Sequence, residues 1–168
     1  MNFHIRKALV EDAIRCAEIH IQAWQETYRG IIPDSYLDAA NLEKRIKMWE
    51  KIIEDHQLFS IVAEIEDIGV VGYLTAGKNR SPQFSGYGEI MGIYLLKNYH
   101  HKGIGQALFN TGLRLLKEQG QTKVSLWVLK DNPTCAFYLK MKGQEREQQE
   151  IDIAGKKLVE LAYVWETI

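Results

Sequence analysis

The stretch IYLLKNYHHKGIGQALF at residues 93–109 joins an apolar, strand-like run to a helix through a basic corner with two glycines. Gly103 and Gly105 lie where the predicted helix begins. Because glycine has no Cβ, the main chain can come close to another group here. The first turn of a helix also has backbone N–H groups without partners and the positive end of the helix dipole. The stretch therefore predicts a bound anion, such as a diphosphate, at this corner.

Two other glycine-rich motifs fit this stretch poorly. A triphosphate-binding loop ends in Gly-Lys-Ser or Gly-Lys-Thr, whereas Gln106 and Ala107 follow Gly105. A dinucleotide fingerprint needs a third glycine where Leu108 stands, and its first glycine follows the strand directly, whereas residues 97–102 intervene here. A tight turn without any ligand is the remaining alternative for this stretch.

Length and composition predict one globular domain over residues 1–168. Of these residues, 46% are hydrophobic and 26% are charged, which allows a substantial core. A net charge of −1 argues against a nucleic-acid partner, which would need a basic excess. The chain has neither an apolar run as long as a membrane span nor the apolar segment of a signal peptide, so we expect no membrane partner. Cys16 and Cys135 are not spaced as metal ligands, so we expect free thiols, no metal and a cytoplasmic location.

Apolar spacing predicts the order of strands and helices. After a strand at 3–8, steps of three and four predict a helix with one apolar face: Ile14, Ala17, Ile21, Trp24 and Tyr28. A short turn of helix is expected near 33–39, and a second apolar face predicts the next helix: Leu42, Ile46, Trp49 and Ile53. The remaining elements are a hairpin at 58–66 and 69–77, a strand at 86–96, a helix at 104–119, a strand at 123–129, a helix at 132–143 and a hairpin at 145–166.

Local signals predict the ends of two of these helices and the type of sheet. Gly120 is expected to end the helix at 104–119. Asn132 and Pro133 are expected at the N-cap and first position of the next helix, with Gly143 at its end. The strand–helix–strand step from 89 to 129 predicts a parallel pair inside a mixed sheet with helices on both faces.

Two motifs resemble those of the GNAT superfamily of N-acetyltransferases. HHKGIG at 100–105 is similar to the phosphate-binding motif Gln/Arg-x-x-Gly-x-Gly/Ala, with His100 in place of Gln or Arg. LKDNPTCAFYLKMKG is similar to the second motif through Asn132 and Tyr138, with Gln144 where phenylalanine is usual. The order of elements matches along nearly the whole chain. The resemblance implies the mixed α/β GNAT fold: a central, mixed, mostly antiparallel sheet with helices on both faces.

The same resemblance implies an acetyl-CoA-dependent enzyme that moves an acetyl group to a primary amine by direct attack in a ternary complex. Main-chain N–H groups at the glycine corner would hold the diphosphate, and the pantetheine arm would lie along the preceding strand as an added strand. A main-chain N–H near Leu95 would polarise the thioester carbonyl. The residues expected to hold the cofactor are Ile93, Tyr94, Leu95, His101, Lys102, Gly103, Ile104, Gly105, Gln106 and Asn132.

Two side chains are expected to handle protons. A lysine-like amine has a pKa near 10.4, so deprotonating it at pH 7 costs roughly 4.6 kcal/mol. Glu89 is the expected base, since burial would raise the pKa of its carboxyl; its alternative is a carboxylate on the sheet surface. Tyr138 is the expected acid, placed by the resemblance near the departing sulfur; its alternative is a core tyrosine.

The first helices are expected to line the acceptor pocket. Trp24, Tyr28 and Tyr36 are the expected substrate-binding residues, although Trp24 and Tyr28 also fit the apolar face of the first helix. The acceptor is a small-molecule amine or a protein amine. Exposed hairpin strands often pair in this family, which allows a homodimer. The alternative function is a CoA-binding regulatory module without turnover.

Overall fold

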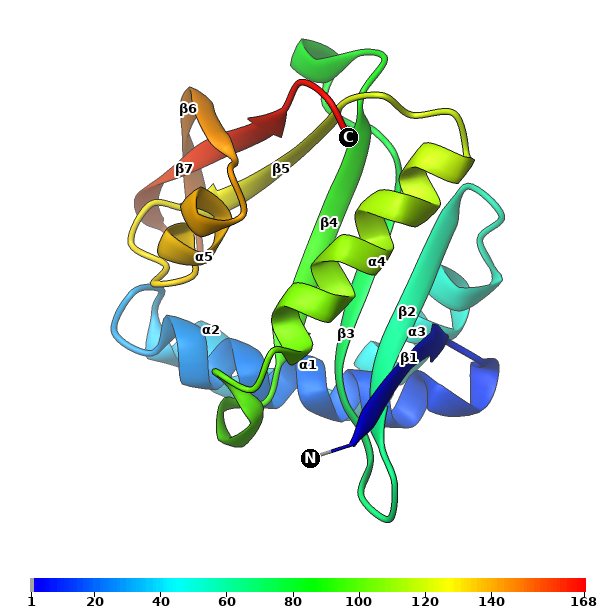
Figure 1. Cartoon of the computed structure of the whole chain (residues 1–168). Coiled ribbons are helices and arrows are strands. Elements are labelled where there is room, and N and C mark those ends of the chain that lie inside the picture. The colour runs from blue at the N-terminus through cyan, green and yellow to red at the C-terminus, as the bar shows by residue number, and fades with distance from the viewer. Residues whose placement is uncertain (1) are drawn as a thin grey trace.

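A seven-stranded sheet in the order β1-β2-β3-β4-β5-β7-β6 organises the computed structural model, which describes residues 2–168 (Figure 1). Only β4 and β5 are parallel neighbours, and every other pair is antiparallel. The strands are β1 (Phe3–Lys7), β2 (Leu58–Ile65), β3 (Gly69–Lys78), β4 (Gly88–Leu95), β5 (Val124–Leu129), β6 (Gln144–Ile153) and β7 (Lys156–Trp165). The mixed, mostly antiparallel sheet and the parallel pair at its centre confirm the predicted fold class.

The helices cover both faces of this sheet (Figure 1). They are α1 (Ala13–Tyr28), α2 (Asp34–Asp38), α3 (Leu42–Glu54), α4 (Ile104–Glu118) and α5 (Cys135–Lys140), with short 3-10 turns η1 (Val10–Asp12), η2 (Pro82–Phe84) and η3 (Lys97–Tyr99). One face of β2, β3 and β4 packs against α4, and α1 and α3 cover the opposite face. Among residues 2–168, none of the helices combines the length and the apolarity that a membrane crossing requires.

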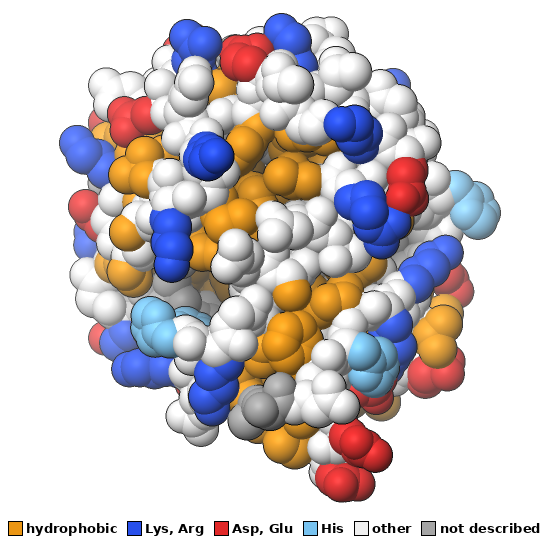
Figure 2. Space-filling view, in the orientation of Figure 1, with side chains coloured by type: hydrophobic (Ala, Val, Ile, Leu, Met, Phe, Trp, Pro, Cys, Tyr) orange, Lys and Arg blue, Asp and Glu red, His pale blue; other side chains and the backbone are white. Residues whose placement is uncertain are grey.

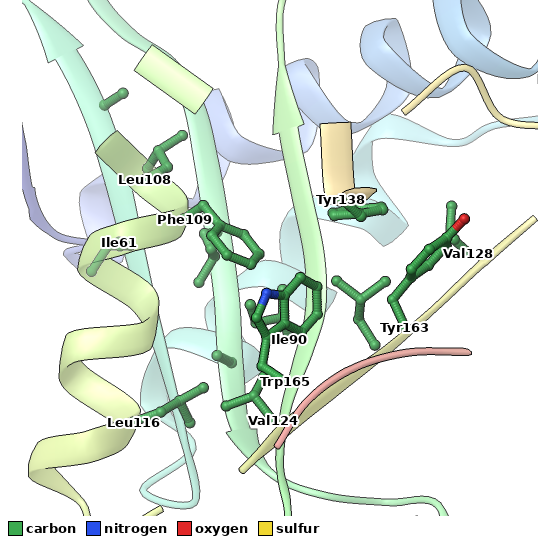
Figure 3. Close-up of a cluster of buried hydrophobic side chains, with 14 of the residues drawn as sticks. Ile61, Ile90, Leu108, Phe109, Leu116, Val124, Val128, Tyr138, Tyr163 and Trp165 are labelled. Carbon is green, nitrogen blue, oxygen red and sulfur yellow. The ribbon is translucent and has the colours of Figure 1, made fainter. Parts of the chain in front are cut away.

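The main core lies between α4 and the sheet and extends to α5 and the end of β7 (Figure 3). Phe109 of α4 packs against Trp165 of β7 with ring centroids 5.1 Å apart, and the Trp165 Nε1–H donates to the Met141 carbonyl at 2.8 Å. At Gly112 a Cβ would lie 2.9 Å from the Leu74 side chain, so glycine lets α4 approach β3 closely.

At their N-termini, α1 and α3 leave exposed one residue each of the apolar faces that were predicted to be buried. Ile14 is 55% exposed, because α1 turns its small residues Cys16 and Ala17 towards the sheet and α3. Small side chains let the helix and the sheet approach closely, whereas Ile14 lies on the solvent side of α1. Leu42, the first residue of α3, is also 42% exposed, whereas Trp49 in the same helix is buried.

The ends of α5 differ from the prediction, whereas Gly120 ends α4 with a φ of 87° as predicted. The helix begins at Cys135 with Thr134 as its N-cap, so Asn132 and Pro133 lie in the preceding turn. Lys142 takes the left-handed conformation at the other end, with a φ of 65°. Gly143 follows it for a packing reason: a Cβ there would lie 2.7 Å from the Trp165 ring.

The parallel pair at the centre of the sheet separates soon after it begins. Gly88 pairs with Val124 and Glu89 with Ser125, and the ladder ends there. A bulge in β4 opposite Thr75 and Ala76 bends the strand away from β5. The remaining backbone of β4 that faces β5 is therefore left without a strand partner. This separation opens a gap in the middle of the sheet.

Candidate active site

A cavity of about 670 Å³ fills the gap between β4 and β5. Figure 2 shows hydrophobic side chains in the hollow between α4 and α5, with basic and histidine side chains around its edge. The lining residues are Thr27, Tyr28, Ile90–Leu95, His100, His101, Gly103, Gly105, Gln106, Leu126–Val128, Asn132–Thr134, Ala136–Tyr138, Lys140 and Met141. Segments from both halves of the chain thus meet at one site.

The N-terminus of α4 forms one end of the cavity. Gly103 is its N-cap residue with a φ of 81°, and no side chain caps the helix. The first helical hydrogen bond outside the first turn runs from the Ala107 N–H to the Gly103 carbonyl at 3.0 Å. The N–H groups of the first turn are therefore free to donate to a ligand, and a Cβ at Gly103 would meet nothing within 4 Å. This corner can accept an anion on its main chain.

The side chains before this corner hold the loop together. His100 Nε2 lies 2.9 Å from the Leu95 carbonyl oxygen, so His100 ties the loop back to the end of β4. Lys102 Nζ donates to the Asn98 carbonyl at 2.9 Å and lies 5.4 Å from the centre of the Tyr99 ring. Lys102 therefore braces η3, whereas His101, with a φ of 59°, lines the cavity.

The end of β4 forms the long wall of the cavity. Ile93, Tyr94 and Leu95 all line it, and their strand has no ladder to β5 beyond Glu89. An extended chain can therefore add to the free edge of β4 by main-chain hydrogen bonds.

Tyr138 forms the wall opposite β4, on α5. Its ring packs beside Tyr163, with centroids 5.8 Å apart, and is buried at the edge of the main core (Figure 3). Burial raises the pKa of the Tyr138 phenol, and the neighbouring Tyr28 and Cys135 side chains raise it further. The phenol therefore stays protonated at neutral pH and can donate its hydrogen towards the cavity.

Glu89, the residue predicted to act as the base, lies outside this cavity. It stands at the closed end of the β4–β5 pair, where both of its carboxylate oxygens accept hydrogen bonds from Arg80. Oε2 accepts from Arg80 Nε at 3.1 Å and from the Arg80 backbone N–H at 2.9 Å, and Oε1 accepts from Nη2 at 2.8 Å. The structure thus does not bring Glu89 to the other predicted site residues.

Of the three aromatic residues predicted to bind the acceptor, only Tyr28 lines the cavity. Its hydroxyl oxygen accepts a hydrogen bond from Asn132 Nδ2 at 3.0 Å. Trp24 packs behind it, with its ring 5.1 Å from the Tyr28 ring. Tyr36 of α2 is 47% exposed and lies outside the cavity lining.

His20 supports this aromatic wall from behind, a role that we did not predict for it. Its ring stacks on Trp24 and on Tyr94, at centroid distances of 5.4 and 5.6 Å, and its Nδ1 lies 2.9 Å from the Tyr73 hydroxyl. Burial lowers the pKa of the His20 imidazole to about 3, and the positive charge of Arg45 adds to this effect. A neutral ring thus fills the core behind Tyr94. The only sequence signal is its spacing of four from Trp24.

Comparisons with known proteins agree with this geometry. Residues 15–143 match the model of the Acetyltransferase (GNAT) family. The chain is 32% identical over 162 residues to the uncharacterized N-acetyltransferase YuaI of Bacillus subtilis, covering 96% of this chain and 91% of that protein.

Two comparisons also find similarity to acetyltransferase sequence and structure from Thermoplasma acidophilum. A spermidine N(1)-acetyltransferase is 26% identical, with 83% of this chain and 87% of that protein covered. The crystal structure of the PaiA N-acetyltransferase in complex with coenzyme A superposes with a TM-score of 0.71 at 21% identity, covering 96% of this chain and 98% of that one.

Proposed function

Because this chain belongs to the acetyltransferase (GNAT) family, we propose that it binds acetyl-CoA in the cavity between β4 and β5 and acetylates an amine. The observation that carries the proposal is the gap itself. A free strand edge, an uncapped helix N-terminus and a buried phenol meet around it. The alternative of a regulatory module without turnover is not favoured, since the similar proteins are named as acetyltransferases.

The residues around the gap fit acetyl-CoA in two places. The free first-turn N–H groups of α4, beside the open space at Gly103, suit the diphosphate. The free edge of β4 at Ile93, Tyr94 and Leu95 suits the pantetheine arm, which carries amide groups that can pair with a strand. Asn132, in the loop across the gap, adds an amide side chain.

In the acyl transfer, β4 and Tyr138, on opposite walls of the cavity, have different roles. Bound acetyl-CoA supplies a thioester, at which the amine forms a C–N bond while the C–S bond breaks. A main-chain N–H of β4 near Leu95 stabilises the negative charge that develops on the carbonyl oxygen. The Tyr138 hydroxyl, which is protonated at neutral pH, donates a hydrogen bond to the sulfur as the C–S bond breaks.

The amine must lose one proton before or during the attack. Glu89 takes no part in this step, because its carboxylate is ion-paired with Arg80 at the closed end of the strand pair. The side chains at the cavity that can pass a proton on are phenols and imidazoles: Tyr28, Tyr94, Tyr138, His100 and His101. We assign the removal of the proton to water held by these groups.

The acceptor is a primary amine that enters beside the end of α1. Tyr28 provides the aromatic wall there, with Trp24 packed behind it. Aromatic faces attract cations, and a protonated amine is one. The similarity to a spermidine N(1)-acetyltransferase makes polyamines the first amines to test, followed by amino acids and peptides with a free N-terminus.

Release of free thiol from acetyl-CoA across a panel of such amines tests the function. We expect at least one amine to raise thiol release, and Tyr138→Phe to slow it by about a hundredfold or more, as is usual when a general acid is removed. Tyr87→Phe is the matched control, since the Tyr87 hydroxyl bonds Glu166 at 2.9 Å and lies outside the cavity. The proposal is refuted if coenzyme A neither binds to the protein nor shifts its unfolding temperature.

A cytoplasmic location and a homodimer are the remaining parts of the proposal. Cys16 and Cys135 are free thiols, which suits a reducing compartment. Within residues 2–168, the long strand β6 lies at the edge of the sheet and pairs only with β7, so it can receive a second copy of the chain. Light scattering on the purified protein measures the mass that decides this.

A further inference from the structure

A buried hydrogen bond joins the acceptor side of the cavity to the coenzyme side. Asn132 Nδ2 donates to the Tyr28 hydroxyl oxygen at 3.0 Å, across 104 residues of sequence. Tyr28 is the last residue of α1, and Asn132 lies in the loop between β5 and α5. Both side chains are more than nine-tenths buried, with exposures of 7% and 6%, and both line the cavity.

The Asn132 amide is held at both of its ends. Its Oδ1 accepts from the Thr134 backbone N–H at 2.8 Å, while its Nδ2 donates to Tyr28. These two bonds fix which end of the amide faces which neighbour. One N–H of the amide group is left over. Asn132 therefore has one donor available for a ligand in the cavity.

Tyr28 is itself placed rigidly enough to serve as a support. Its ring belongs to a separate apolar cluster whose other buried members are Ile32, Leu37, Leu129 and Leu158. Burial also raises the pKa of the Tyr28 phenol, so the hydroxyl stays neutral and keeps its hydrogen. The position of Tyr28 is therefore set by packing within the protein and not by contact with the coenzyme.

We propose that Tyr28 is a positioning residue for the coenzyme, which it serves by holding the Asn132 amide ready to donate to the pantetheine arm. This inference rests on the proposed function. It makes α1, the acceptor-side helix, part of the coenzyme site.

Calorimetric titration with coenzyme A tests the support. We expect Tyr28→Phe to weaken binding about tenfold, since it removes the oxygen that a buried amide N–H donates to. Asn132→Ala should weaken it by a similar factor. The double variant should be no weaker than Asn132→Ala alone, because the hydroxyl acts only through the amide.

Tyr87→Phe provides the matched control, since it also removes one tyrosine hydroxyl bond, 2.9 Å long, but outside the cavity. It should leave the affinity for coenzyme A unchanged. Urea unfolding of all variants separates a loss of stability from a loss of binding. If Tyr28 had only a structural role, Tyr28→Phe would lower the free energy of unfolding. The double variant would then lose affinity for coenzyme A by the product of the two single-variant factors.

Two results would overturn the inference. If the wild-type chain binds coenzyme A and Tyr28→Phe binds it equally well, Tyr28 positions nothing, and the proposed function stands. Independent losses in the double variant have the same meaning. If the wild-type chain itself binds no coenzyme A, the proposed function fails and this inference fails with it.

Discussion

Replacing Gly103 with alanine puts a known strain into the corner that we assign to the diphosphate. Gly103 has a φ of 81°, and a left-handed conformation costs an L-residue about 1–2 kcal/mol. The added Cβ would meet nothing within 4 Å, so no clash adds to this cost. We therefore expect the backbone strain in Gly103→Ala to cost about 1–2 kcal/mol of free energy, with no contribution from a steric clash.

This strain can lower either the free energy of unfolding or the affinity for coenzyme A. If the corner keeps its conformation, the free energy of unfolding falls by the full amount. If the free protein relaxes the corner, the strain returns when the ligand binds, and each 1 kcal/mol weakens coenzyme A binding about fivefold. The two losses together should make up the predicted 1–2 kcal/mol. Gly103→Asn should recover part of it, because asparagine tolerates this conformation better.

Gly105 provides the contrasting variant two residues along. It lies inside α4 with an ordinary negative φ, and a Cβ there would only touch Phe137 at 3.9 Å. Gly105→Ala should therefore stabilise the chain, by up to about 1 kcal/mol. Alanine also occurs at this position in the motif that the sequence resembles, so coenzyme A binding should be retained.

Urea unfolding and calorimetric titration with coenzyme A measure both quantities on the same samples. The reasoning requires a loss for Gly103→Ala and none for Gly105→Ala. It is refuted if Gly103→Ala unfolds and binds like the wild type. Equal losses for the two alanine variants would also refute it, since only one position needs a left-handed backbone.

Three further predictions address the rest of the chain. Glu89→Gln should keep kcat/KM within about twofold, because no reacting group lies near it; a loss of a hundredfold would restore its role as the base. Gly143→Ala should lower the free energy of unfolding by about 1–3 kcal/mol, since its Cβ would lie 2.7 Å from the Trp165 ring; an unchanged melting temperature would contradict this packing. Burial on its own raises the pKa of the Asp12 carboxyl, but hydrogen bonds from Arg6 and the Leu9 N–H outweigh it and bring that pKa below its usual value. The bonds therefore add stability above the unfolded pKa near 3.9 that is lost as the pH falls through the folded value, and urea unfolding against pH should show a smaller acid loss in Asp12→Asn.

Local sequence patterns are enough to predict the order of the elements and the glycine corner before α4. Helices and strands follow from spacings of three, four and two residues, which act between near neighbours. The left-handed turn at Gly103 is also a local property, because it depends on one missing Cβ. β4 is also apolar on both faces near its end, which is typical of a strand at the centre of a sheet, where it lies. Such features are readable because the atoms that decide them lie close together along the chain.

Which of the predicted residues meet depends instead on contacts between distant parts of the chain. Glu89 lies on β4, the strand that lines the cavity, but at the end where β4 pairs with β5. The two strands separate at the other end of β4, so the carboxylate faces Arg80 instead of the cavity. Tyr28 and Asn132 stand 104 residues apart, and no local pattern foretells their hydrogen bond. Contacts of this kind depend on the register of paired strands and on where a pair separates. Register and separation are set by the packing of the whole sheet against its helices, which a local spacing does not encode.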